Sequence, residues 1–346
     1  MAARLTLIVQ DFLPGEGTGI GRYCDNLLRE FRARGLRFNV RSLSTRDFRV
    51  GPIHFGYYQR IAYQRAFVRP SGVVHTMYLL AIPPTTRIAT VWDTFYMRGP
   101  PSPHIGARWV HEGVKRDLMR RPLLYVAITE AVRKELHRHL NLPFDRIFVA
   151  QPGVEIDRLR PKNGPRPAAM PEDGKVNVLH VGLGYERKGV HRLVDALAEL
   201  GPEKFRLVRV GPARNPTYVR AYQSRASAVG LELVECGFVP NDALPAYYGY
   251  ADLFVFPSAD EGAGIPPLEA MACGTNVVVS DLPAHREMCG DLAFYASSEP
   301  GGLAAAIAKA LDGRRPADVL RGHAAKFTWS KTAETYLRLY SEVGAA

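Results

Sequence analysis

Residues 257–280 read PSADEGAGIPPLEAMACGTNVVVS, and they follow an apolar run at residues 253–256. The apolar run predicts a buried strand, and residues 277–280 predict a second one. Between them, Gly262 and Gly264 leave the backbone bare, so that a ligand can approach it closely. The stretch therefore predicts a strand, a loop, a helix and another strand, which is the repeating unit of a parallel sheet.

The helix predicted in this stretch opens with two prolines. Pro266 and Pro267 suit a first helical turn, because no amide hydrogen is missed there. A helix N-terminus behind a bare loop presents amide groups and the positive end of its dipole, and both bind phosphate oxygens. The stretch therefore predicts a phosphate-binding element.

The same alternation of short apolar runs and longer amphipathic segments continues along the rest of the chain. In the first part, strands are predicted at residues 5–9, 38–43, 72–75, 88–91, 124–128 and 147–150, with a helix over 20–34. In the second part, strands are predicted at residues 176–181, 205–210, 231–235, 253–256 and 277–280. This pattern predicts an α/β fold with two Rossmann-like, doubly wound domains.

A proline-rich stretch separates the two patterns. Residues 161–174 contain four prolines and two glycines, which cannot sustain a helix or a central strand. We place a linker there, with a first domain over residues 1–160. Two such sheets facing one another would form a central cleft lined by the carboxyl ends of their strands, where ligands of this fold class bind.

The composition is that of a globular protein. The chain has 346 residues, 47% apolar and 23% charged, which is enough for two domains. It has no apolar run near the roughly 18 residues of a membrane span. Residues 1–9 read as a first strand rather than a signal peptide, and the four cysteines are scattered, so we expect a cytoplasmic protein.

The positive charge is concentrated in the first half. Residues 1–162 contain 26 Lys and Arg against 13 Asp and Glu, whereas residues 163–346 contain 19 against 21. Such asymmetry indicates an anionic partner, either a lipid surface, a phosphorylated acceptor or a nucleic acid, or simply a well-solvated basic domain. No zinc-finger, RRM or KH signature supports the nucleic-acid reading.

Two glutamates flank the phosphate-binding loop. Glu261 and Glu269 have seven residues between them, and the helix dipole alone would explain a carboxylate at the second position. The whole stretch, with Ala-Met-Ala-x-Gly after Glu269 and Val-Val-x-Ser at its end, closely resembles the E-x7-E signature of family 4 retaining glycosyltransferases. The resemblance extends over nearly the whole chain and implies the GT-B fold.

The resemblance also implies roles for individual residues of the second domain, over residues 161–326. In the family, the second glutamate binds the ribose hydroxyls of a nucleotide, and the first lies against the transferred sugar; these positions are Glu269 and Glu261. Loop amides around Gly264 and Ile265 would hold the distal phosphate. Backbone groups near Val239 would meet the nucleobase.

Two adjacent cations form the second element of the predicted site. Residues 180–190 read HVGLGYERKGV, and they place Arg187 and Lys188 at the carboxyl end of a predicted strand. The two residues are either surface charges or groups that neutralise a leaving diphosphate. The resemblance implies the second role and places Gly182 at the donor, although Leu183 replaces the family's usual arginine. The chain has no Asp-x-Asp triplet, so we expect no metal site.

The first domain offers weaker matches. The loop at residues 15–23 reads GEGTGIGRY; it lacks the last glycine of G-x-G-x-x-G, which argues against a dehydrogenase or epimerase. Tight turns explain its glycines, and it also resembles the family's first loop, which implies that Gly19 reaches the donor. Asp93 and Trp92 resemble part of the family's Val-His-Asp on the acceptor side, with tryptophan replacing histidine, while a strand-end cap explains Asp93 equally well.

Two further segments bear on the partners. Residues 327–346 resemble the family's closing helix, which packs back on the first domain, with Trp329 as an anchor. Residues 107–121 predict a helix with Val110, Val114 and Leu118 on one stripe and lysines and arginines beside it. Such a helix either lies on anionic lipid or simply faces the core.

Together these features predict a retaining, metal-independent glycosyltransferase that moves a hexose from a nucleoside diphosphate sugar to a hydroxyl of a glycan or lipid-linked acceptor. The adjacent Arg-Lys pair resembles mannosyl-type members that use GDP-mannose, and no cofactor is expected. A location at the inner face of the membrane follows from the lipid reading. A sugar phosphorylase, an inactive relative and a basic nucleic-acid-binding protein remain the alternatives.

Overall fold

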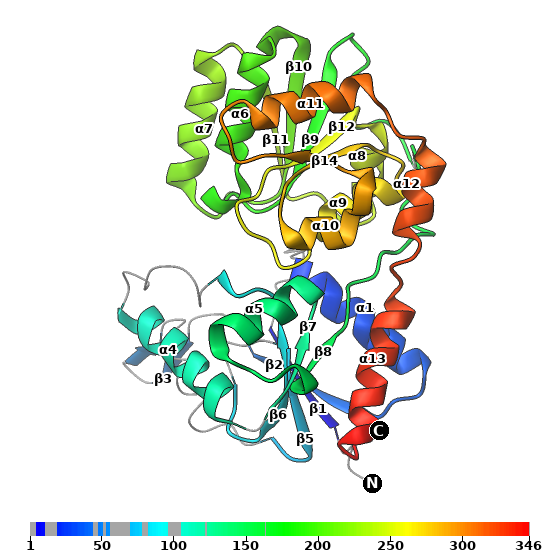
Figure 1. Ribbon diagram of the computed structural model, residues 1–346. Helices are drawn as coiled ribbons and strands as arrows, with labels where there is room; N and C mark the ends of the chain where they lie inside the picture. The colour runs from blue at the N-terminus through cyan, green and yellow to red at the C-terminus, as the bar shows by residue number, and fades with distance from the viewer. Residues whose placement is uncertain are drawn as a thin grey trace. The chain divides into compact units, whose positions relative to one another are not determined.

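The computed structural model describes residues 5–10, 19–43, 48–50, 53–55, 70–77, 82–95, 105–121, 123–162 and 164–345. The chain divides into two compact units, Met1–Gly153 with Trp329–Ala346, and Val154–Thr328. Each unit contains a six-stranded parallel sheet flanked by helices (Figure 1). The predicted α/β class with two Rossmann-like domains is therefore confirmed.

The sheet of the first unit has the order β2-β1-β5-β6-β7-β8. Its strands are β1 Leu5–Gln10, β2 Phe38–Leu43, β5 Val73–Thr76, β6 Thr86–Val91, β7 Leu124–Ala127 and β8 Ile147–Val149. Its helices are α1 Gly19–Ala33, α4 Ile105–Arg120, α5 Glu130–Leu140 and α13 Trp329–Glu342. A separate antiparallel pair, β3 Phe48–Val50 and β4 Ile53–Phe55, was not predicted.

The C-terminal helix α13 packs on α1 within the first unit, as predicted for the closing segment. The Tyr23 and Tyr336 hydroxyls are 3.1 Å apart, and the Tyr23 ring also meets the Trp329 ring at a centroid distance of 5.1 Å. The His75 ring joins the same core, with Nδ1 2.6 Å from the Tyr340 hydroxyl. Trp329 is therefore buried in the core that ties the chain's end to the first sheet.

The sheet of the second unit has the order β11-β10-β9-β12-β13-β14. Its strands are β9 Val176–Val181, β10 Phe205–Val210, β11 Glu232–Gly237, β12 Leu253–Phe256, β13 Val277–Ser280 and β14 Phe294–Ala296. Its helices are α6 Val190–Glu199, α7 Pro216–Ala228, α8 Leu244–Tyr250, α9 Ile265–Ala272, α10 Pro283–Cys289, α11 Gly302–Asp312 and α12 Ala317–Ala324. The strand order reverses between β9 and β12, and the carboxyl ends of such a switch point are where doubly wound sheets bind ligands.

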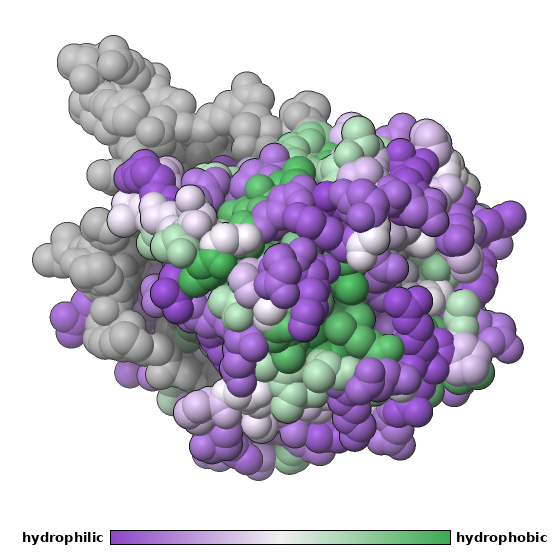
Figure 2. Space-filling model, turned by 90° about the horizontal axis from the view of Figure 1, so that it is seen from above, coloured by the Kyte–Doolittle hydropathy of each residue, from purple (hydrophilic) through white to green (hydrophobic). Residues whose placement is uncertain are grey.

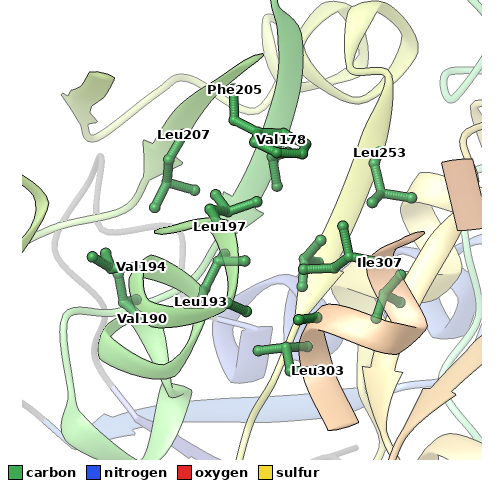
Figure 3. Packing of buried hydrophobic residues seen from close by; sticks show 14 of the residues in the cluster. Val178, Val190, Leu193, Val194, Leu197, Phe205, Leu207, Leu253, Leu303 and Ile307 are labelled. Atoms are coloured by element: carbon green, nitrogen blue, oxygen red, sulfur yellow. The ribbon is translucent and has the colours of Figure 1, made fainter. Parts of the chain in front are cut away.

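One hydrophobic core holds α6, α7 and α11 against this sheet. In α6, Val190, Leu193, Val194 and Leu197 recur at helical spacing and are fully buried. Figure 3 shows them around α6, with Val178, Phe205 and Leu207 of the strands on one side and Leu303 of α11 on another. The core fixes the start of α6, and so the loop that precedes it, on the sheet.

The proline-rich residues 161–174, predicted as the linker, lie on the second unit, because the chain divides after Gly153. The Arg166 guanidinium sits 4.8 Å from the Tyr250 ring centroid, and Met170 is fully buried. Asp173 forms a 2.5 Å ion pair with Arg206 of β10. These contacts make the segment part of the second unit.

The surface seen in Figure 2 mixes hydrophilic residues with smaller hydrophobic areas, as is usual for a globular protein. None of the helices that the structure describes is both long enough and apolar enough to cross a bilayer.

Candidate active site

The candidate site lies at the carboxyl ends of β9 and β12, at the switch point of the second sheet. Gly182 follows β9 directly, and its amide donates to the Val210 carbonyl at 2.8 Å. The loop at residues 257–264 follows β12 and leads into α9. The two segments that the sequence predicted as donor-binding therefore start from neighbouring strands.

A buried ion pair joins these two loops. The Lys188 ammonium contacts Glu261 Oε1, and Arg187 Nη1 lies 3.9 Å from the same oxygen. The Lys188 and Glu261 side chains are only 11% and 10% exposed. The Lys188 ammonium also lies 4.9 Å from the centroid of the Phe256 ring. One carboxylate and two cations thus meet beside an aromatic face, in a place where charge is weakly screened.

Backbone contacts hold the two cations and the carboxylate of this cluster in place. Residues Glu186–Lys188 form a 3-10 turn that ends at Gly189, with φ of 71°. A Cβ at Gly189 would lie 2.2 Å from the Pro257 carbonyl oxygen, so only glycine fits there. The Ala259 amide donates to the Arg187 carbonyl at 2.8 Å. The turn with the cations and the loop with the carboxylate are therefore fastened together.

The electrostatic surroundings keep Glu261 ionised. Burial alone would raise the pKa of its carboxyl, but the Lys188 ammonium and the Arg187 guanidinium outweigh that effect and hold the pKa below its ordinary value. The carboxylate is therefore negative at neutral pH and faces the two cations. An anion that enters near Lys188 would compete with Glu261 for the ammonium.

The helix predicted after the bare loop is present as α9. Gly264 is the N-cap residue with φ of 80° and ψ of 57°, a left-handed conformation that glycine adopts without strain. Ile265 begins the helix, and Pro266 and Pro267 occupy its first turn. Within the part of the chain that the structure describes, no side chain caps this N-terminus, and the amides of such a helix start can bind an anion.

Glu269 lies inside α9 and is only 5% exposed. The Tyr248 hydroxyl donates to Glu269 Oε2 at 2.8 Å, and the Thr275 hydroxyl donates in turn to the Tyr248 carbonyl at 2.6 Å. This chain of hydrogen bonds fixes the direction of the carboxylate. Sequence reasoning missed Tyr248, because nothing in the pattern of α8 marks one tyrosine among its neighbours.

Arg209 was also missed. This side chain of β10 is 1% exposed, and its guanidinium donates to the Gly182 carbonyl at 3.1 Å and the Gly211 carbonyl at 2.7 Å. Its Nε donates to Glu235 at 2.5 Å. Arg209 therefore fixes the loops after β9 and β10. The two arginines of this otherwise apolar strand, Arg206 and Arg209, were the available signal.

Val239, predicted near the nucleobase, follows β11 and is 8% exposed. The Gly237 carbonyl before it accepts from the Gly211 amide at 2.6 Å. A backbone hydrogen bond thus ties the end of β11, two residues before Val239, to the residue after β10. Its predicted contact is through the backbone, and its burial agrees with a packing role for the side chain.

The structure shows what surrounds Trp92 and Asp93, two of the candidate residues in the first unit. Gly19 is the first residue of α1, and residues 15–18 of its predicted loop lie outside the described residues. The Trp92 indole is 9% exposed and donates to the Met77 carbonyl at 2.7 Å. Asp93 Oδ1 accepts from the Phe95 amide at 3.3 Å, which is the strand-end cap considered from the sequence. Trp92 therefore packs into its own unit.

Helix α4 turns the predicted apolar stripe to the core, which is the second of the two readings considered from the sequence. Val114 and Leu118 are fully buried, whereas Trp109 and Met119 are 60% and 52% exposed. The side chain of Val110 lies outside the described residues. Arg121, grouped with the basic residues of the helix, instead donates to the carbonyls of residues 83, 84 and 86, so it fastens the chain before β6.

Part of this chain is similar to a protein family and to known proteins. Residues 166–327 match the family described as "Glycosyl transferases group 1". The O-antigen chain mannosyltransferase B of Escherichia coli is 29% identical over 240 residues, covering 63% of this chain and 60% of that protein. The D-inositol 3-phosphate glycosyltransferase of Acidothermus cellulolyticus is 33% identical over 218 residues, covering 57% and 48%. The chain thus spans about half to three-fifths of the length of these relatives.

Among solved structures, HepE from Anabaena in complex with UDP-glucose superposes with a TM-score of 0.75 at 17% identity, covering 98% of this chain and 100% of that one. This likeness shows the shared fold. The family match is confined to residues 166–327, and the likeness to HepE concerns the fold of the whole chain.

Proposed function

We propose that this chain is a retaining glycosyltransferase that moves a hexose from a nucleoside diphosphate sugar to a hydroxyl of an acceptor. The observation that carries the proposal is the Lys188–Glu261 pair, held beside the uncapped start of α9. Cations and amides at one place suit a diphosphate, and a carboxylate beside them suits a sugar that gains positive charge at its reacting carbon.

The proposed reaction divides the work among these groups. The bond between the anomeric carbon and the diphosphate oxygen breaks, and the acceptor oxygen forms a bond to that carbon on the same face. The acceptor's proton passes to the departing diphosphate. Lys188, Arg187 and the amides near Gly264 stabilise the developing negative charge, and Glu261 orients the sugar. No metal takes part in this scheme.

The nucleotide would lie along the residues predicted from the sequence. Glu269, aimed by Tyr248, would bind the ribose hydroxyls. Gly182 and the backbone near Val239 would line the diphosphate and the base. The name of the E. coli relative specifies mannosyl transfer, which supports GDP-mannose as the donor we propose; HepE binds UDP-glucose, which makes that nucleotide sugar the first competitor to test.

The acceptor is proposed to be a glycan or a lipid-linked glycan, with the first unit on its side. The exposed face of α4, with Trp109, Met119 and the arginines 108, 116 and 120, supports contact with an anionic membrane surface at its cytoplasmic face. Sedimentation with anionic and with neutral vesicles tests this part. Absence of binding to both would remove the membrane from the proposal.

The activity is tested by combining the protein with GDP-mannose, UDP-glucose and other nucleotide sugars and following nucleotide release and product formation. We expect one donor to be used without added metal, and NMR of the product to show the donor's anomeric configuration retained. Calorimetry with GDP and UDP, and with NAD as control, tests the binding step. Inverted configuration, or binding of NAD but of neither diphosphate, would contradict the proposal.

A further inference from the structure

The described part of the second unit holds buried polar atoms without hydrogen-bond partners at the edge where the candidate site lies. They include Ser258 Oγ just after β12, Ser280 Oγ at the end of β13, and His285 Nε2 in α10. Ser258 and His285 are fully buried. Native proteins pair almost all of their buried polar groups, so unpaired ones at one edge indicate missing partners.

The hydrogen bond on the other side of the His285 ring fixes its tautomer. His285 Nδ1 lies 2.8 Å from the Ser280 carbonyl oxygen, and a carbonyl can only accept. The proton is therefore on Nδ1. Burial lowers the pKa of this histidine, so the ring is neutral at ordinary pH. It follows that Nε2 is a bare acceptor, and that its missing partner must be a donor.

His285 Nε2 is aimed at the start of α9. A Cβ placed on Gly264 would lie 2.8 Å from His285 Cδ2 and 3.1 Å from Nε2, so the ring edge lies against this glycine. The ring is also 5.9 Å from the ring of Phe256, over which the Lys188 ammonium sits. Glu261 is close enough to His285 to interact with it electrostatically. The bare acceptor therefore belongs to the wall of the proposed donor site.

The chemistry of a nucleotide sugar narrows the identity of the missing donor. Phosphate oxygens at neutral pH accept hydrogen bonds and cannot supply one to Nε2. The ribose hydroxyls are already assigned to Glu269, and the base to the chain near Val239. The hydroxyls of the transferred sugar are donors that would lie beside Glu261.

We propose that His285 Nε2 accepts a hydrogen bond from one hydroxyl of the transferred sugar and so selects the sugar of the donor. The inference rests on the proposed function, since it requires a nucleotide sugar in this site. His285 makes no bond to the leaving group and moves no proton. Its contribution is to reject donors in which that hydroxyl is missing or points elsewhere, because the buried acceptor then stays unpaired.

Two substitutions test the roles of the two ring nitrogens of His285 separately. In His285→Asn, the amide can keep the bond from the Nδ1 position to the Ser280 carbonyl, but no acceptor remains at the Nε2 position. In His285→Gln, the longer side chain returns an amide oxygen toward the Nε2 position. Both are compared with wild type by melting temperature and by calorimetry with GDP and UDP, which report folding and the nucleotide half of the site.

The decisive measurement is kcat/KM for GDP-mannose or UDP-glucose, whichever is turned over, and for its 2-, 3-, 4- and 6-deoxy analogues. For wild type, we expect kcat/KM to be roughly tenfold to a hundredfold lower with one of the analogues than with the parent donor. His285→Asn should use that analogue as well as the parent donor. His285→Gln should recover part of the discrimination. Affinity for the diphosphate should be the same in all three proteins.

The outcomes separate the two proposals. If wild type binds no nucleoside diphosphate and turns over neither sugar nucleotide, the proposed function fails, and this inference fails with it. If the nucleotide binds normally but His285→Asn keeps the full wild-type discrimination against every deoxy donor, the role of His285 is refuted while the proposed function stands. A water molecule as the only partner of Nε2 would give this second result.

Discussion

The two units satisfy the polar groups at their strand ends differently. In the first unit, the residues after β6 bond to the unit itself: the Trp92 indole donates to the Met77 carbonyl, and Asp93 accepts from a nearby amide. In the second unit, Ser258 and His285 keep buried atoms unpaired after β12 and β13. Among the described residues, the second unit therefore has unpaired buried polar atoms after β12 and β13, whereas Trp92 and Asp93 after β6 are paired within the first unit.

The charges differ in the same way. Most lysines and arginines that the structure describes in the first half are exposed, so water screens them, whereas Lys188 of the second half is buried against Glu261. A large net charge in one unit thus does not locate the chemistry. The buried and paired charges on which the proposed function rests occur in the unit with almost balanced charge.

The largest effect is expected from Lys188→Ala. Removing the ammonium takes away the buried cation that would neutralise the departing diphosphate, so kcat should fall by about a hundredfold to a thousandfold. Turnover of the preferred nucleotide sugar measures this, and circular dichroism checks folding. Arg225→Ala removes a half-exposed cation of the same unit, paired with Asp195, and should leave turnover unchanged. Normal turnover in Lys188→Ala would remove this residue from the mechanism.

Arg209→Met tests whether the loops after β9 and β10 depend on the hydrogen bonds from the Arg209 guanidinium. The substitution leaves Glu235 with the Tyr222 hydroxyl but without its buried cation, and removes a donor from two loop carbonyls, so the free energy of unfolding should fall by about 3 kcal/mol. Denaturant titration measures the change. Affinity for the nucleoside diphosphate should fall as well, and unchanged affinity would show that these loops do not depend on Arg209.

Tyr248→Phe removes the hydroxyl that aims Glu269. Losing one hydrogen bond to a carboxylate should weaken binding of GDP or UDP several-fold, equivalent to about 1 kcal/mol, with little change in kcat at saturating donor. Calorimetry gives the affinity directly. An unaltered dissociation constant would count against the assignment of Glu269 to the ribose.

Trp92→Phe is the corresponding change in the first unit. It removes the indole donor to the Met77 carbonyl and part of the contact with Tyr23, so stability should fall by about 1 kcal/mol. Nucleotide affinity in the second unit should not change. If this variant lost nucleotide binding, Trp92 could not be only a packing residue of the first unit, and the distinction between the two units would fail.

The smallest effect concerns the pH dependence of stability. Because the pKa of Glu261 is below its ordinary value of 4.5, its ionised form stabilises the fold at pH values above the unfolded pKa. That contribution is lost as pH falls through the lower, folded pKa. The difference in unfolding free energy between wild type and Glu261→Gln should therefore shrink between pH 6 and about pH 3. A difference that is constant with pH would contradict the pairing.

The alternation of apolar runs was sufficient to predict the sheets of both units. Strands β9, β10, β12 and β13 have the predicted bounds, because each is a short, fully or largely apolar run between turn residues. Strand β14 was missed, since Phe294–Ala296 is too short to form a distinct pattern. The proline-rich segment was read as a linker because its composition excludes helix and strand, but composition does not reveal what a chain packs against.

The candidate site was predictable where its residues share a local motif. Glu261, Gly264 and Glu269 lie in one stretch with a recognisable order, and their predicted roles remain predictions. Arg209 and His285 could not be found this way. Each owes its importance to a neighbour distant in sequence, the Gly182 carbonyl in one case and Gly264 in the other, and such contacts appear only when the strands are assembled.

The central claim is that the second unit binds a diphosphate between its buried cation and the start of α9. The most direct test is a crystal structure of the protein with GDP or UDP. The account predicts the distal phosphate within hydrogen-bond distance of the Lys188 ammonium and the amides at Gly264 and Ile265, with the ribose hydroxyls on Glu269. A nucleotide bound elsewhere, with Lys188 still paired to Glu261, would contradict it.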